Sequence, residues 1–133
     1  MKKALVLISL TMLIFSTGCS QMQSAAQVGP TVISLKELQS SVDSILVERA
    51  KVDTSQMQLQ QGENLTRSQL NFLISNLIIE SIATDEKIAV SKADTEAYLT
   101  QIYANIGGPK QLPAVLVNAS IAPENLQSVL RRD

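Results

Sequence analysis

The stretch TRSQLNFLISNLIIESI, residues 66–82, carries the strongest apolar pattern of the chain. Its apolar residues recur at intervals of three and four positions, as they do on one face of an α-helix: Leu70, Leu73, Ile74, Leu77, Ile78 and Ile82. Ahead of them, Thr66 and Gln69 have the spacing of a capping box, which satisfies free backbone groups at a helix start. We therefore predict that this segment is the central helix, with Leu77 fully buried.

Two apolar residues, Phe72 and Ile79, fall off this stripe. They indicate either burial on more than one side of the helix or an apolar patch left for a partner, and burial is favoured. Near the end of the same helix stand Glu80, Asp85 and Glu86. A catalytic carboxylate pair needs a cleft that separates the protonation of its members, so a solvated helix end is the favoured interpretation.

Upstream, Ser34 and Glu37 form another capping box, directly after the short β-prone run Thr31-Val32-Ile33. We predict a helix from there to about Ala50. Its apolar face comprises Leu35, Leu38, Val42, Ile45 and Leu46, and its polar residues Glu37, Ser41, Asp43 and Glu48 face water. The Gln-rich segment from Val52 to Glu63 is predicted to be a long surface connection.

Downstream, Ser91 and Asp94 offer a helix start, and Gly107-Gly108 offers its end. Pro109 and Pro123 each open a further short helix. The predicted apolar faces of these three helices are Leu99, Ile102, Tyr103 and Ile106, then Leu112, Val115 and Leu116, then Leu126, Val129 and Leu130. The predicted fold class is therefore all-α, a small orthogonal helical domain with one short β-strand before the first helix.

The chain begins like an exported lipoprotein. Lys2 and Lys3 are followed by the apolar run 4–15, and small residues directly precede Cys19. The end of this leader, Ser16-Thr17-Gly18-Cys19, resembles a lipobox, although Ser16 stands where an aliphatic residue is usual. We predict that residues 1–18 are a signal peptide and that Cys19 is lipidated. An ordinary signal beside a free cysteine is the weaker alternative, because Cys19 stands where cleavage is expected.

Residues 19–29 are rich in Gln, Ser and Ala, and we predict a flexible tether there, ahead of a domain spanning 30–133. Beyond the leader, acidic residues outnumber basic ones and no basic run occurs, which argues against a nucleic-acid partner. The chain has no His and one Cys, which excludes the usual zinc sites and Ser-His or Cys-His nucleophiles. We predict no catalytic residue, no metal and no cofactor.

The order of these elements resembles the N-terminal chaperone domain of SurA-type proteins. The resemblance covers about Val28 to Asp133 and is carried by patterns: a V-I-S strand, an L-K-E-L helix, the long apolar helix, the segment 86–94, the Gly-Gly break and the last helix opened by Pro123. In that family the last helix runs on for several turns, often into a parvulin isomerase domain, so the resemblance implies a domain shortened at its C-terminal helix.

The resemblance implies binding of unfolded or partly folded exported polypeptides, without isomerase activity, by a protein held through the lipid on Cys19 on the extracytoplasmic side of the cell membrane or outer membrane. We predict possible client contacts at Phe72 and Ile79 and at Met57 and Leu59 in the connection. The structural alternatives are favoured for all four: Phe72 and Ile79 as core residues, and Met57 and Leu59 as cover over the helix layer. The alternative is an adaptor lipoprotein that holds one specific envelope partner.

Overall fold

The computed structural model describes residues 23–132. The predicted signal peptide 1–18 and Cys19 lie outside these residues. The described chain runs in this order: β1 (Ser24–Val28), β2 (Thr31–Ser34), α2 (Leu35–Arg49), α3 (Gly62–Asp85), α4 (Lys92–Ile106), the 3-10 turn η2 (Pro109–Gln111), α5 (Leu112–Ala119), the 3-10 turn η3 (Pro123–Asn125) and α6 (Leu126–Arg132). The predicted fold class, mostly helical with a short strand before the first helix, is confirmed.

Local capping signals account for several helix ends. Ser34 caps α2, because its side chain accepts a hydrogen bond from the backbone N–H of Glu37 at 3.0 Å. Ser91 caps α4 in the same way through the N–H of Asp94. Gly107 ends α4 in the left-handed conformation at φ 85°, which glycine adopts at little steric cost. These three boundaries confirm the sequence prediction.

The start of α3 differs from the prediction. The helix begins at Gly62, one turn before the expected cap, and Thr66 lies inside it with its hydroxyl donating to the Gly62 carbonyl at 3.3 Å. The residue before the helix, Gln61, makes no side-chain cap bond. Leu65, on the added turn, is buried in the core, and its burial outweighs the missing cap.

The flexible tether predicted for residues 19–29 is wrong for its second half. Ser24–Val28 forms β1, which pairs antiparallel with β2 through a turn at Gly29 and Pro30. Gly29 has φ 57° at the first central position of this two-residue turn, where a type II′ hairpin requires glycine. Composition could not reveal the strand, because strand formation depends on the pairing partner and on packing against α3.

The hydrophobic core lies where α2 crosses α3, under the hairpin. Its buried members are Ile33, Leu38, Val42, Ile45, Leu65, Leu73 and Ala122. Leu35 and Leu46, predicted on the apolar face of α2, are each 48% exposed because they lie at its edges. Leu77, predicted to be fully buried, is only partly buried, and this prediction is wrong. The reason is that α2 crosses α3 in its first half, whereas Leu77 lies in the second half, beside an open pocket under the hairpin turn.

A buried polar seam joins the helices beside this core, formed by Ser41, Gln69, Ser120 and Asn125. The Ser41 hydroxyl donates to Gln69 Oε1 at 3.0 Å, and Gln69 Nε2 donates to the Ser120 carbonyl at 2.7 Å. Asn125 Nδ2 donates to Ser41 Oγ at 3.2 Å. The prediction that Ser41 faces water is therefore wrong, since its partners come from α3 and η3 and replace the water it loses.

Arg49 ties the end of α2 to two other segments. Its Nη1 donates to the Gln60 carbonyl at 2.7 Å, and its Nη2 donates to Ser120 Oγ at 3.2 Å. Burial lowers the pKa of the guanidinium from its ordinary value. The loop between α2 and α3 and the turn after α5 are thus both held by one side chain. Ser120 itself lies at φ 53°, which aims its carbonyl and hydroxyl toward α3 and α2.

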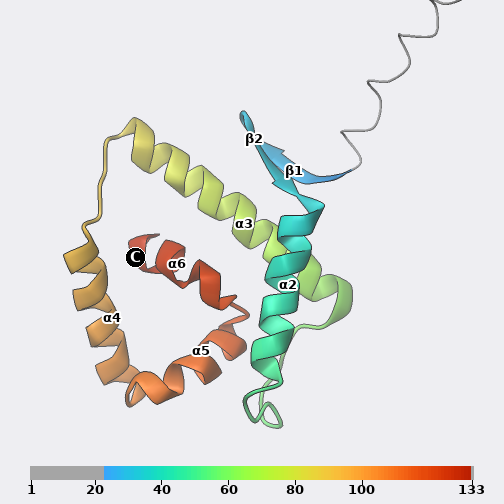
Figure 1. The fold of residues 1–133 in the computed structure, drawn as a ribbon, viewed down its shortest axis with the longest axis vertical. Coiled ribbons are helices and arrows are strands. Elements are labelled where there is room, and N and C mark those ends of the chain that lie inside the picture. The colour runs from blue at the N-terminus through green and yellow to red at the C-terminus, as the bar shows by residue number, and fades with distance from the viewer. Residues whose placement is uncertain (1–22, 133) are drawn as a thin grey trace, which may run out of the picture.

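Figure 1 shows how the second half of α3 is placed. The helices α2, α3, α4 and α5 frame α6, which packs against α4, while α5 packs against α2. Leu116, Val117 and Leu130 are buried in this second group of helices. The C-terminal half of α3 extends away from α2 and the core, toward the segment that connects it to α4. A run of apolar residues on this half therefore stays uncovered.

Candidate functional site

The uncovered half of α3 and the segment that follows it carry exposed apolar side chains. Five of them are at least 36% exposed: Ile78, Ile79, Ile82, Ile88 and Val90. We call these five residues the α3 apolar surface. Exposed apolar residues that lie together mark places where another chain or a ligand binds. Isolated exposed apolar residues elsewhere, such as Val115 on α5, need no such explanation.

A pocket of about 490 Å³ is lined by three of these five residues, Ile79, Ile88 and Val90, whereas Ile78 and Ile82 lie outside it on a neighbouring face of α3. Ile79 and Ala83 of α3 form one wall, and Ile88 and Val90 of the connecting segment form another. The wall from α6 comprises Ser128 and Arg131. The pocket therefore combines three segments that lie far apart in the sequence, and its lining mixes apolar side chains with the polar Asn76, Glu80, Thr84, Ser128 and Arg131.

The connecting segment leaves α3 through a defined turn. The N–H of Ile88 donates to the Ala83 carbonyl at 2.8 Å, and the N–H of Lys87 donates to the Thr84 carbonyl at 3.2 Å. This pair of bonds is the Schellman pattern, which places the residue after the left-handed position against the last helical turn. The left-handed residue here is Lys87, at φ 56°, rather than the usual glycine. The turn brings Ile88 back toward Ala83, so both line the pocket.

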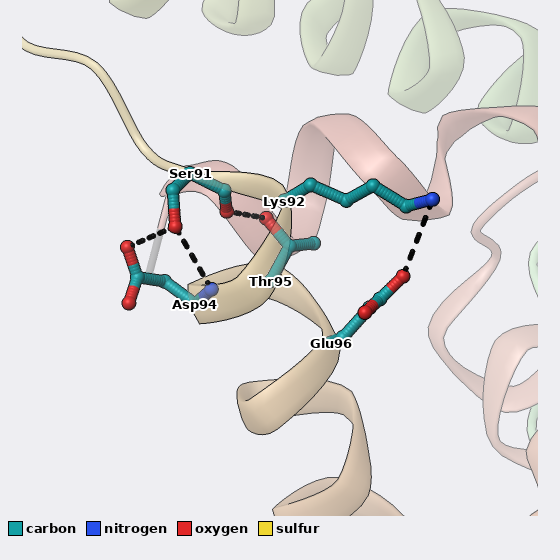
Figure 2. A network of polar contacts seen from close by, with 5 residues as sticks. All are labelled: Ser91, Lys92, Asp94, Thr95 and Glu96. Carbon is teal, nitrogen blue, oxygen red and sulfur yellow. Dashed lines mark hydrogen bonds and ion pairs between the residues drawn. The ribbon is translucent and has the colours of Figure 1, made fainter.

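The far end of the connecting segment is held by the N-terminal cap of α4 (Figure 2). Ser91 Oγ donates to Asp94 Oδ2 at 2.6 Å and accepts from the Asp94 N–H at 3.1 Å. The Thr95 hydroxyl donates to the Ser91 carbonyl at 3.1 Å, and Lys92 and Glu96 form an ion pair at 3.5 Å. Because Ser91 is fixed by these bonds, the neighbouring Val90 is held at the pocket wall.

The charged groups of the pocket are Glu80 and Arg131. Between residues 23 and 132, no group of three or more His, Cys, Asp or Glu side chains is placed to hold a metal ion. None of the helices in this part of the chain combines the length and hydropathy that crossing a membrane requires. The pocket can shelter apolar side chains of another molecule, and its polar lining residues can offer hydrogen bonds to that molecule.

The structure separates the four predicted client contacts into two groups. Phe72 and Ile79 lie on α3 seven positions apart, which is two turns on the same helix face. Phe72 is partly buried against the core, whereas Ile79 is 36% exposed and lines the pocket. Met57 and Leu59 are partly buried in the loop before α3, and the first residue of that helix, Gly62, lies about 25 Å along the helix axis from Ile79. Neither of them lines the pocket.

Most residues that line the pocket could not be identified from the sequence. Ile88 and Val90 lie in a short segment without periodicity, and Ser128 and Arg131 belong to a helix whose position depends on α4. The one available signal was the spacing of Phe72, Asn76, Ile79 and Ala83, at intervals of four, three and four positions on one helix face. This second stripe identifies the face of α3 that lines the pocket, although not the segments opposite it.

Comparison with known proteins gave one informative result. A family model described as a SurA-like N-terminal domain matches residues 1–133, and no parvulin domain was detected in these residues. No curated protein and no solved structure matched the chain. The match to the family model extends over the whole sequence. The chain therefore belongs to the family of SurA-like N-terminal domains.

Proposed function

We propose that this protein is a lipid-anchored, chaperone-like binding module that holds unfolded or partly folded exported polypeptides on the extracytoplasmic side of a bacterial membrane. The observation that carries the proposal is the α3 apolar surface with its pocket of about 490 Å³. A holdase needs accessible apolar surface on a stable scaffold, and it needs no catalytic group.

Family membership supports the coarser part of this proposal. A SurA-like N-terminal domain is a chaperone-related envelope fold and suggests binding of polypeptide substrates in general. The finer part, binding of exported chains while they are unfolded, rests on the sequence features of the leader and on the exposed apolar residues of α3. An unfolded polypeptide offers apolar side chains on an extended backbone, and these are the groups that the pocket can shelter.

The expected affinity is low. Covering the exposed part of one Ile or Val side chain contributes about 1 kcal/mol. The three of these side chains that line the pocket, Ile79, Ile88 and Val90, therefore contribute about 3 kcal/mol before the cost of ordering the bound chain. This corresponds to a dissociation constant of roughly 1–10 mM for a single segment. Weak, reversible binding suits a protein that must release its clients.

Aggregation assays test the holding activity. Protein beginning at residue 20 keeps every residue of the described fold, and its helices can be verified by circular dichroism. In excess, it should slow the light-scattering increase of several unrelated denatured proteins. The substitution Ile79→Ser should weaken this effect, whereas Val115→Ser should not, because Val115 has nearly the same exposure, 39%, but lies outside the pocket.

The alternative function is that of an adaptor that holds one specific envelope partner. The observation in its favour is that the pocket walls are held in place, by the turn at Lys87 and by the cap at Ser91. A wall of fixed shape suits a single partner. Tight capture of one protein from an envelope extract, together with failure to protect several unrelated clients, would reject the holdase in favour of the adaptor.

The anchor and the absence of isomerase activity are parts of the same proposal. Cys19→Ser should abolish incorporation of a labelled fatty acid and release the protein from the membrane fraction, and unchanged labelling would reject the anchor. The protein should leave the time constant for cis to trans isomerisation of a proline peptide at its uncatalysed value, roughly tens to hundreds of seconds. Acceleration of that isomerisation would reject the non-enzymatic function.

A further inference from the structure

A second pocket, of about 340 Å³, lies on the neighbouring face of α3. The turn of the hairpin at Gly29 and Pro30 forms one side of it, and Leu77, Ser81 and Asp85 of α3 form the other. Glu80 and Thr84 line both this pocket and the apolar one. The last turns of α3 therefore form a ridge between two hollows, with the Glu80 side chain on the ridge.

The two hollows differ in charge. The second pocket is lined by the carboxylates of Glu80 and Asp85, and no Lys or Arg is among its lining residues in the described chain. It lies beside the C-terminal end of α3, where the helix dipole adds partial negative charge, and the last turn of α3 carries no basic residue. The first pocket has one carboxylate, Glu80, and one guanidinium, Arg131, among its lining residues, so its charges balance.

Within the described residues, no ion pair is formed by the carboxylates of Glu80 and Asp85 at this end of α3. Among the residues that the structure describes, ion pairs join Lys51 to Glu48 and Lys92 to Glu96, and none involves Glu80 or Asp85. Their negative charge is therefore available to a partner. Such a field attracts a cationic group and repels an anionic one, and repulsion of the wrong partner contributes to specificity as much as attraction of the right one.

We propose that this surface selects extended polypeptide segments in which an apolar side chain and a Lys or Arg lie about three residues apart. The apolar side chain occupies the pocket formed by Ile79, Ile88 and Val90, and the cationic side chain reaches Glu80 and Asp85 in the second pocket. This inference rests on the proposed function, because it names the class of polypeptide that the chaperone-like surface binds.

The spacing follows from the dimensions of the ridge. An α-helix with its side chains is about 10–12 Å in diameter. An extended chain advances about 3.3 Å per residue, so it crosses this width in about three residues. The long, flexible side chains of Lys and Arg can absorb a difference of one residue in either direction.

Peptide binding tests the proposal. Three labelled peptides share the same Leu positions and carry Lys, Ser or Glu three residues after each Leu, and their fluorescence anisotropy is followed during titration with protein that begins at residue 20. At low salt, the Lys peptide should bind about five-fold more tightly than the Ser peptide, and the Glu peptide more weakly than both. The difference between the peptides should shrink at about 0.5 M salt, where screening is strong.

Two sets of variants assign the effect to its residues. Glu80→Gln with Asp85→Asn should bring the Lys and Ser peptides within about two-fold of each other. Glu63→Gln with Glu86→Gln is the matched control, because it removes the same charge from the two ends of α3 outside both pockets. Ile79→Ser should weaken all three peptides by a similar factor.

The outcomes separate this inference from the proposed function. The inference is overturned if the Lys and Glu peptides bind with equal affinity or if none of the three peptides binds. It is also overturned if the preference for Lys survives in the Glu80→Gln, Asp85→Asn variant. The holding activity is decided by the aggregation assays, which use unrelated clients regardless of their charge. Protection of those clients without a preference for Lys therefore rejects only the apolar and basic specificity.

Discussion

The buried polar seam predicts that Gln69→Leu destabilises the protein far more than its position on a helix indicates. Gln69 is 1% exposed and makes two hydrogen bonds, accepting from the Ser41 hydroxyl and donating to the Ser120 carbonyl. Leucine has a similar size and a good helix propensity, so the substitution leaves the helix itself intact. What it removes is the partner of two buried polar groups on other segments.

The magnitude follows from those two groups. Leaving a buried donor or acceptor without a partner costs about 1–3 kcal/mol. Ser41 still accepts from Asn125, but its hydroxyl proton and the Ser120 carbonyl each lose their partner. The added apolar burial of leucine offsets about 1 kcal/mol. The free energy of unfolding should therefore fall by about 1–5 kcal/mol, a substantial share of the roughly 5–15 kcal/mol typical of a domain.

Urea denaturation followed by circular dichroism measures this change. The midpoint should shift to lower urea with an unchanged slope, which distinguishes lost stability from a change in the unfolded chain. Gln101→Leu is the control, because Gln101 is exposed on α4 and its replacement should change the free energy by less than about 0.5 kcal/mol. Combination with Ser41→Ala should reveal a coupling of about 0.5–3 kcal/mol, since the two residues share a bond.

A clear result would refute this reasoning. If Gln69→Leu unfolds within about 0.5 kcal/mol of the parent protein, the seam does not hold α2, α3 and the turn after α5 together. The same conclusion follows if Gln69→Leu and Ser41→Ala are strictly additive, because residues joined by a buried hydrogen bond cannot be independent.

Three further predictions concern particular residues. Lys87→Gly should raise the free energy of unfolding by about 1 kcal/mol, because Lys87 has φ 56°, whereas Lys87→Ala should bring no such gain. Leu65→Ala should cost about 2–5 kcal/mol in chemical denaturation and the partly buried Leu77→Ala clearly less, and equal losses would contradict the placement of the core. The Ser55 backbone N–H, which donates to Asp53 Oδ1 at 2.9 Å, and secondly the Ser55 hydroxyl hold the pKa of Asp53 below its ordinary 3.8, so its carboxylate favours the folded state above that pH and loses this effect as pH falls through the folded pKa. NMR titration should give a higher pKa in Ser55→Pro, which lacks the backbone N–H, and a smaller rise in Ser55→Ala, which keeps it; an unchanged pKa in Ser55→Pro would contradict this cause.

Helix ends and the fold class could be predicted from the sequence because their causes are local. The caps at Ser34 and Ser91 are bonds between residues three positions apart, and the stop at Gly107 depends on one backbone conformation. The start of α3 was predicted at Thr66, one turn too late, because its cause is not local. Burial of Leu65 extends that helix by a turn, and burial is not a local property.

The candidate site could be predicted only in part. Ile79 was identified as an apolar residue off the main stripe, and it lines the pocket. The other walls come from the segment after α3 and from α6, whose positions depend on how α4 packs against α6. The residue pattern of one helix does not indicate which distant segment packs against that helix.

The helical fold class and most helix boundaries follow from the sequence alone, because helix capping and apolar periodicity depend on residues only a few positions apart. The types of catalytic and metal site that the chain lacks residues for are likewise evident from its composition. The tertiary structure decided which faces are covered. It paired Ser24–Val28 with β2, buried Ser41 and Gln69 against partners 28 to 84 positions away, and left the second half of α3 exposed. The physical reason is that burial depends on contacts between segments far apart in the chain, and only the folded arrangement supplies them.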